Sequence, residues 1–277
     1  MAYVAAILFG LVTGSFLNVC IYRIPRGRSI VRPRSACPHC GRPIPFFDNI
    51  PLVSYLILRG RCRHCAARIS PQYPAVETLN GLLWLLCVVH FGLSLSALFY
   101  AVFASAMLVL AFIDVSHRIL PHGITFGGLA LAVASAPWQW LHQAQSQQLA
   151  IANFFALFGL RLENPWLISW LDSLLGVACG AGMLLVVAIG YFLVKKEEGM
   201  GHGDIVMMGF VGAVLGPQLA FLTILMGSFA GALVGVVLIQ QTRDSKYQIP
   251  FGTFLGGAAV VVLFWGNAIL HWYWDLI

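Results

Sequence analysis

Charged side chains are scarce in this sequence. Only 9% of its 277 residues are Asp, Glu, Lys or Arg, whereas a soluble domain has about 25%. Hydrophobic residues make up 60% of the chain, and its mean hydropathy is +0.85. Internal repeats and low-complexity tracts are also absent. The composition excludes an ordinary soluble domain and predicts an all-α polytopic membrane protein.

Long uncharged runs predict about eight transmembrane helices, because a helix needs roughly 20 apolar residues to cross a bilayer. The run 78–113 is long enough for two helices that turn near residues 92–96, and the run 205–242 for two that turn near Pro217. Single helices are predicted within 1–22, 122–141, 173–194 and 247–274. The first run lacks a basic leading region and an A-x-A cleavage site, which favours a retained helix over a signal peptide.

Basic residues predict the orientation of these helices. Fifteen of the 16 Lys and Arg residues fall on one side of an eight-helix arrangement, and Arg161 alone falls opposite. By the positive-inside rule that side is cytoplasmic, so both termini face outward. The net charge of +6 therefore reflects topology and attraction to anionic lipid headgroups. We do not interpret it as a nucleic-acid site.

Three regions follow from these patterns. Residues 1–24 form the first transmembrane helix, 25–73 a basic cytoplasmic loop, and 74–277 the remaining transmembrane bundle. Within the bundle, residues 142–166 mix apolar and polar side chains in a way that predicts an amphipathic helix on the outer leaflet.

Two C-x-x-C motifs lie in the basic loop, and 21 residues separate them. They are Cys37 and Cys40 in "CPHC", and Cys62 and Cys65 in "CRHC". Four thiolates at this spacing predict a structural zinc site in a small zinc-ribbon-like module, with a redox dithiol pair as the alternative. Cytoplasmic disulfides are rare, which favours the metal. Cys20, Cys87 and Cys179 lie in apolar runs and are interpreted as packing residues.

Two of the ten acidic residues have unusual positions. Asp114 closes the apolar run "LVLAFID", where a carboxylate opposes the helix dipole. Asp204 follows the glycine-rich turn "GMGHG" at the start of another apolar run. Its glycines permit positive φ angles and close approach of another chain. Both acids are expected at the same depth on the cytoplasmic side.

Three interpretations of these acids remain open at this point. The two carboxylates could share a proton, activate a water and protonate a scissile amide, as an aspartyl protease dyad does. Alternatively, Asp114 pairs with Arg118 and Asp204 caps a helix. A third possibility is a proton or cation path through a transporter.

The sequence resembles the bacterial prepilin peptidases of type 4 pili and type II secretion, a family of aspartic proteases with a G-x-G-D motif. The resemblance spans nearly the whole chain and adds four motifs to the paired C-x-x-C loop and "GMGHGD". They are "GSFLNVCIYRIP" at 14–25, "ISPQYPAVETLNG" at 69–81, "FIDVSHRILP" at 112–121 and "IPFGTFLG" at 249–256.

This resemblance implies that Asp114 and Asp204 are the catalytic pair and that the four loop cysteines bind zinc. It also implies a membrane endopeptidase that cuts the basic leader from prepilins and pseudopilins at the cytoplasmic face. N-methylation of the new amino terminus by S-adenosylmethionine is expected to follow, although no sequence motif identifies the residues that hold this cofactor. A cation-coupled transporter is the alternative function, and a non-catalytic assembly factor would lack one aspartate.

Some residues depart from the family pattern. His122 stands where a second acid is frequent, His202 lies inside the glycine turn, and "IVMM" follows Asp204 where a lysine is common. These differences leave both aspartates in place and bear on substrate preference and pH profile.

Overall fold

The computed structural model groups the chain into two compact units, Met1–Phe112 and Ile113–Ile277, and each is described by itself. The described residues are 1–140, 155–157, 163–197, 199–242 and 250–276. Every long element in them is a helix, which confirms the predicted all-α class.

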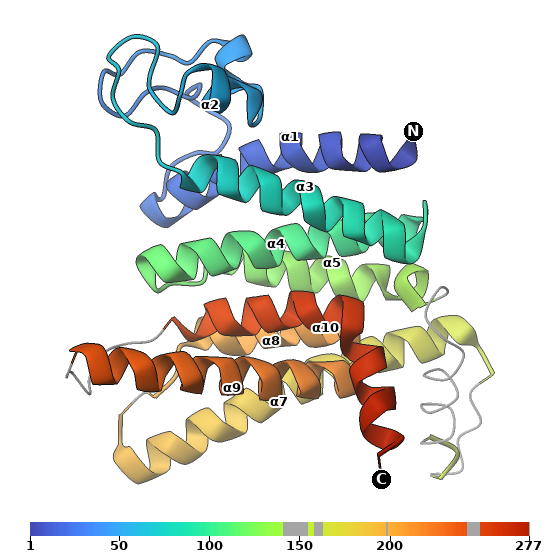
Figure 1. Cartoon of the computed structure of the whole chain (residues 1–277). Helices are drawn as coiled ribbons and strands as arrows, with labels where there is room; N and C mark the ends of the chain where they lie inside the picture. The colour runs from blue at the N-terminus through green and yellow to red at the C-terminus, as the bar shows by residue number, and fades with distance from the viewer. Residues whose placement is uncertain (141–154, 158–162, 198, 243–249, 277) are drawn as a thin grey trace. The chain divides into compact units, whose positions relative to one another are not determined.

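The first unit contains three long helices: α1 (Ala2–Arg23), α3 (Gln72–Phe91) and most of α4 (Leu95–His117). Helix α1 lies along α3 (Figure 1). Glycines bring the two backbones together, because a side-chain carbon at Gly10 would lie 2.7 Å from Cα of Gly81.

A buried amide links these three helices. The Asn80 side chain on α3 donates to the Gly10 carbonyl at 2.7 Å and to the Thr13 hydroxyl at 2.8 Å, both on α1. Its Oδ1 accepts a hydrogen bond from the Ser105 hydroxyl on α4 at 2.7 Å. The polar side chain is therefore satisfied inside an apolar bundle, where unpaired polar groups are costly.

The loop between α1 and α3 holds short elements only: η1 (Ile24–Arg26), η2 (Phe46–Asn49) and α2 (Val53–Ile57). Each C-x-x-C motif forms a tight turn closed by an isolated bridge, between Ala36 and Pro43 in the first and between Arg61 and Arg68 in the second. The two motifs thus form the same kind of turn, and their four cysteines lie close together.

The second unit is built around α8 (His202–Leu215), in which every residue from Met207 to Leu215 is buried. Its neighbours are α5 (His122–Trp140), α7 (Pro165–Lys195), α9 (Pro217–Thr242) and α10 (Phe251–Trp274). A helix that is apolar all round belongs in the interior of a bundle. Gly176 on α7 lies directly against the backbone of Gly212 on α8, so these two helices are in backbone contact.

Six helices of the described chain are long and apolar enough to span a membrane: α1, α3, α4, α7, α9 and α10. The chain is therefore a polytopic membrane protein. The predicted turns are present, since α3 ends at Gly92 with φ of 69° and Gly216 separates α8 from α9. The total of eight spans, the orientation and the boundaries of the three regions stay predictions.

Helix α7 begins at Pro165, earlier than the uncharged run starting at residue 173 predicts. Asn164 caps it by accepting the Trp166 N–H at 3.0 Å, and proline fits the first helical turn. The extension places Asp172 inside the helix, where it is buried. The predicted amphipathic helix at 142–166 falls mostly on residues outside the described part of the chain.

Candidate active site and metal site

Asp114 lies in the last turn of α4, and its carboxylate is held by the start of α10. Its side chain is buried, and its Oδ2 accepts two hydrogen bonds from Thr253, from the backbone N–H at 2.8 Å and from the hydroxyl at 3.1 Å. Both residues belong to the second unit, although 139 positions separate them. Two donors on one oxygen stabilise the ionised form of a carboxylate.

Asp204 lies in the first turn of α8. The N-cap of this helix is Gly201, so the alternative that Asp204 is the N-cap is wrong. Its Oδ1 is buried and has no hydrogen-bond partner within the described residues. An unpaired buried carboxylate oxygen is costly, and such atoms are often ones that take part in chemistry.

Gly252, next to Thr253 in the first turn of α10, lies between the two acids. A side-chain carbon at this position would lie 3.0 Å from Oδ1 of Asp204 and 3.2 Å from Oδ2 of Asp114. The two carboxylates therefore line the same small space beside the Gly252 backbone. The fold brings together the two acids that the sequence analysis singled out 90 positions apart.

The glycine-rich turn before Asp204 serves a different purpose from the one expected. None of its glycines has a positive φ, and Gly201 has φ of −71°. The space beside Gly203 is filled by Leu120, whose Cβ would lie 2.7 Å from an added side-chain carbon, and the Tyr191 ring fills the space beside Gly199. The missing side chains thus allow the chain to pack on itself rather than leaving room for substrate at those two positions.

Thr253 and Gly252 were not assigned roles from the sequence. Both residues lie in the motif "IPFGTFLG", which is part of the family resemblance. The motif does not indicate which residues they contact. Two of the three departures from the family pattern, His122 and His202, are exposed first residues of helices. Only the tertiary contact shows that the Thr253 side chain reaches Asp114.

The four loop cysteines form a cluster in the first unit. All four Sγ atoms lie within 4.8 Å of one another, and Sγ of Cys37 is 3.8 Å from Sγ of Cys65. Four sulfurs at Zn–S distances of about 2.3 Å in a tetrahedron are themselves about 3.8 Å apart, so the cluster fits zinc. Backbone N–H groups of Cys65 and His64 lower the pKa of the Cys62 thiol to about 7, whereas desolvation and hydrogen bonds with the other three thiols raise the pKa of Cys65 to about 11. A bound metal would hold all four cysteines as thiolates.

Comparison with known proteins gives two family matches along the chain. The bacterial peptidase A24 N-terminal domain matches residues 8–91, and the type IV leader peptidase family matches residues 101–236. A prepilin leader peptidase/N-methyltransferase of Pseudomonas aeruginosa is 35% identical, with 96% of this chain and 91% of the relative aligned. Proteins of the same name from Stutzerimonas stutzeri and Legionella pneumophila are 36% and 32% identical, over 97% and 98% of this chain and 92% and 94% of theirs.

No solved structure matches the chain significantly. The described chain is a helical membrane protein in which two acids converge on one small space and four cysteines form a cluster. The chain belongs to the type IV leader peptidase family. Nothing in these comparisons supports the transporter alternative.

Proposed function

We propose that this chain is a prepilin peptidase, a membrane aspartic endopeptidase that removes the basic leader from type 4 prepilins and pseudopilins. The observation that carries the proposal is the convergence of Asp114 and Asp204 on the backbone of Gly252. The prepilin leader peptidase names of the relatives supply the substrate class. Two carboxyl groups on one small space can act as the base and the acid in amide hydrolysis by water.

The contacts of the two acids differ, and the difference suggests their roles. Asp114 carries the two Thr253 hydrogen bonds, which favour its ionised form, so we assign it as the general base. Asp204 has an oxygen without a partner, and a proton on this group would give it a donor for the substrate. In this assignment Asp114 removes a proton from water, and the hydroxide formed attacks the scissile carbonyl carbon. Asp204 protonates the carbonyl oxygen, which gives a gem-diol. Asp114 then passes the proton that it took from water to the leaving nitrogen, and the C–N bond breaks while a gem-diol hydroxyl returns a proton to Asp204.

The location of the site suits such a substrate. Asp114 is near the end of a candidate membrane span, and Asp204 is at the start of the buried helix α8. A prepilin with a cytoplasmic basic leader and an apolar helix presents its scissile bond at this boundary. We therefore place the active site and the cysteine loop on the cytoplasmic side of the inner membrane, as the basic residues of the loop indicate.

We further propose that the four cysteines bind one structural zinc, because a complete thiolate shell leaves no open position for a substrate. The names of the relatives also support methylation of the new amino terminus. S-adenosylmethionine would supply the methyl group, and the residues that hold it are not assigned.

The test is incubation of the purified protein with a prepilin, with and without S-adenosylmethionine, followed by intact-mass measurement. Asp114→Asn and Asp204→Asn should each abolish cleavage while zinc content and thermal unfolding stay unchanged. The double variant should be no worse than either single one, since both acids act in one turnover. Asp172→Asn is the matched control, because it removes another buried acid of the same unit and should cleave normally. Cleavage by a well-folded Asp204→Asn protein at the original rate would refute the dyad.

A further inference from the structure

The segment from Phe46 to Ile57 exposes a cluster of large apolar side chains. Phe46 is 86% exposed, Leu56 73% and Ile57 71%. Phe47, Ile50 and Val53 in the same segment are also exposed. Among the residues of η2 and α2, only Ser54 is buried. A contiguous apolar surface of this kind marks a contact with a membrane or another protein.

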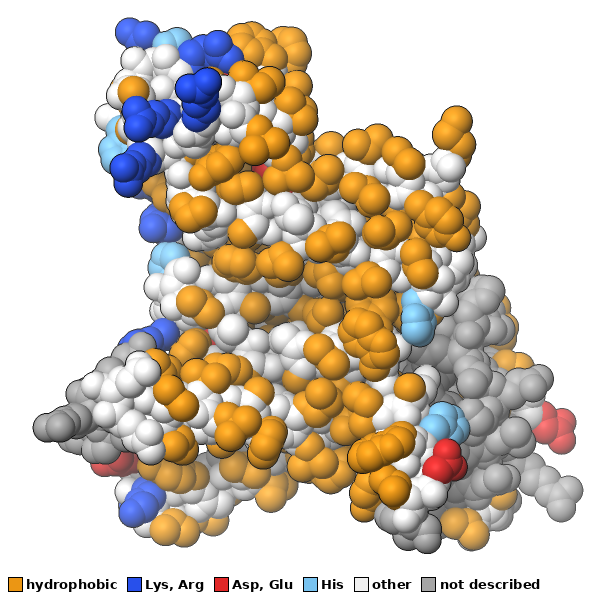
Figure 2. Space-filling view, in the orientation of Figure 1, with side chains coloured by type: hydrophobic (Ala, Val, Ile, Leu, Met, Phe, Trp, Pro, Cys, Tyr) orange, Lys and Arg blue, Asp and Glu red, His pale blue; other side chains and the backbone are white. Residues whose placement is uncertain are grey.

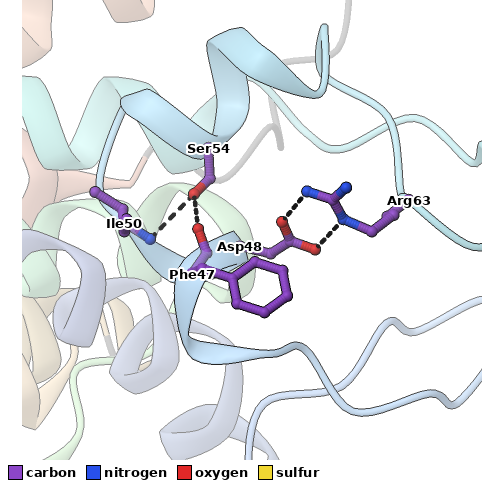
Figure 3. A network of polar contacts seen from close by, with 5 residues as sticks. All are labelled: Phe47, Asp48, Ile50, Ser54 and Arg63. Atoms are coloured by element: carbon purple, nitrogen blue, oxygen red, sulfur yellow. Dashed lines mark hydrogen bonds and ion pairs between the residues drawn. The ribbon is translucent and has the colours of Figure 1, made fainter.

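Internal hydrogen bonds hold this segment in a defined shape. The Ser54 hydroxyl donates to the Phe47 carbonyl at 2.9 Å and accepts the Ile50 N–H at 3.1 Å (Figure 3). Arg63, from the second C-x-x-C motif, donates to both carboxylate oxygens of Asp48 at 2.8 and 2.6 Å. The apolar side chains are therefore presented outward by a segment that is tied to the cysteine cluster.

One further hydrogen bond fixes the level of the segment along a membrane helix. The Leu52 N–H donates to Oε2 of Glu77 at 2.9 Å, and Glu77 is five residues into α3, a candidate span that begins at Gln72. With a rise of 1.5 Å per residue, this attachment lies about 8 Å along the helix from its first residue. Because α3 has 20 residues and is about as long as the hydrocarbon core of a bilayer is thick, this attachment would lie near the edge of a membrane that α3 spans, and that membrane would be the apolar phase nearest to the exposed side chains.

The charge of the loop favours the same partner. Nine arginines and a single acid, Asp48, lie between residues 25 and 73, and Arg63 forms an ion pair with that acid. Figure 2 shows the basic side chains of the loop on one flank and hydrophobic side chains over the flank where α2 lies. Anionic lipid headgroups attract such a surface, whereas the basic leader of a prepilin would be repelled by it.

We propose that the segment 46–57 docks on the anionic surface of the membrane, with Phe46, Leu56 and Ile57 inserted below the headgroups. The arginines of the loop then contact lipid phosphates. The inserted side chains and the cysteine cluster together fix the loop beside the first turns of α3. This proposal concerns the loop alone, so it does not depend on the assignment of the two aspartates.

The test places the photocrosslinker p-benzoylphenylalanine at Phe46 or Leu56 of the full chain in vesicles of phosphatidylethanolamine and phosphatidylglycerol. His39, exposed on the first C-x-x-C motif, is the control position, and zinc content verifies that each variant is folded. We expect lipid adducts on the acyl chains from positions 46 and 56, at least fivefold more than from position 39. Replacing phosphatidylglycerol by phosphatidylcholine should lower the yield at positions 46 and 56.

Four results would count against the proposal. Adducts that join two copies of the chain would show a protein interface, and adducts to residues 113–277 would show that the second unit covers the segment. Equal and low lipid labelling at all three positions would show that the segment faces water. A yield that does not depend on phosphatidylglycerol would refute the role of the arginines.

Discussion

The backbone N–H and the hydroxyl of Thr253 both donate to Oδ2 of Asp114. This contact joins the start of α10 to the end of α4 and makes the environments of the two aspartates unequal. Unequal environments decide which carboxyl group of a pair holds the proton, so Thr253 is the residue that we expect to set the acid and base roles.

Thr253→Val should lower kcat for prepilin cleavage by about ten- to a hundredfold, because the variant loses one hydrogen bond to a charged group. KM and the melting temperature should change little, since valine has nearly the same shape and keeps the backbone N–H. Thr253→Ser retains a hydroxyl and should restore most of the rate. Equal rates for the Val and Ser variants would show that the hydroxyl does not position Asp114.

Gly252→Ala should reduce cleavage by at least about tenfold. The added methyl would lie 3.0 Å from Oδ1 of Asp204 and 3.2 Å from Oδ2 of Asp114, so at least one carboxylate must move. Gly257→Ala on the same helix is the matched control, because no atom lies within 4 Å of its added carbon. Steady-state cleavage assays of both variants provide the comparison, and equal activities would contradict the geometry.

Gly176→Ala should destabilise the second unit by about 1–3 kcal/mol or more, as overpacking does. Its methyl would meet the Gly212 carbonyl, and α7 would have to separate from α8. Gly182→Ala on α7 faces open space and should be neutral or slightly stabilising, because alanine is the better helix former. Thermal unfolding of the detergent-solubilised proteins measures both. A melting temperature unchanged in Gly176→Ala would rule out the backbone contact.

Elemental analysis should find one zinc per chain, and Cys62→Ser should lose it. Three thiolates hold the ion more weakly than four, so the loop should become more sensitive to proteolysis at low chelator concentration. Cys179→Ala removes a thiol outside the cluster and should keep its zinc. Less than a tenth of an equivalent in the carefully prepared wild-type protein would refute the site.

Asp48→Asn should speed hydrogen exchange in residues 46–57 modestly, within about fivefold, because exposed ion pairs stabilise weakly. The hydrogen bond from Arg63 holds the pKa of Asp48 below its usual value. The ion pair therefore stabilises the folded segment fully above a pH of about 4, the usual pKa of Asp. This stabilisation is lost as the pH falls through the lower pKa that Asp48 has in the folded protein. The ratio of exchange rates between variant and wild type should fall toward one as the pH is lowered; a constant ratio would contradict this.

The class of the protein could be predicted from local sequence properties. Uncharged runs predict membrane helices because burial of apolar side chains in the bilayer is favourable whichever other segments the helix contacts. The turns at Gly92 and Pro217 were predictable for the same reason, since glycine and proline act on their own backbone. The four cysteines were predictable as a cluster because their spacing alone suits a tetrahedral ion.

Other features depend on contacts that no local pattern contains. The start of α7 at Pro165 includes the charged residue Asp172, so a rule based on uncharged runs placed it too late. The glycines at 199 and 203 were interpreted as positions that permit unusual backbone angles. In the structure they instead make room for the side chains of Tyr191 and Leu120, which come from other segments of the chain.

The sequence by itself determined that this is a helical membrane protein with two notable acids and a four-cysteine loop. Residue type and spacing carry that information, because hydrophobicity and ligand chemistry are properties of single residues and short motifs. Only the tertiary structure decided that Gly252 separates the two acids and that Thr253 binds one of them and not the other. Those relationships arise where the first turn of α10 meets Asp114 and Asp204, and hydrogen bonds between segments 139 residues apart exist only once the chain is folded.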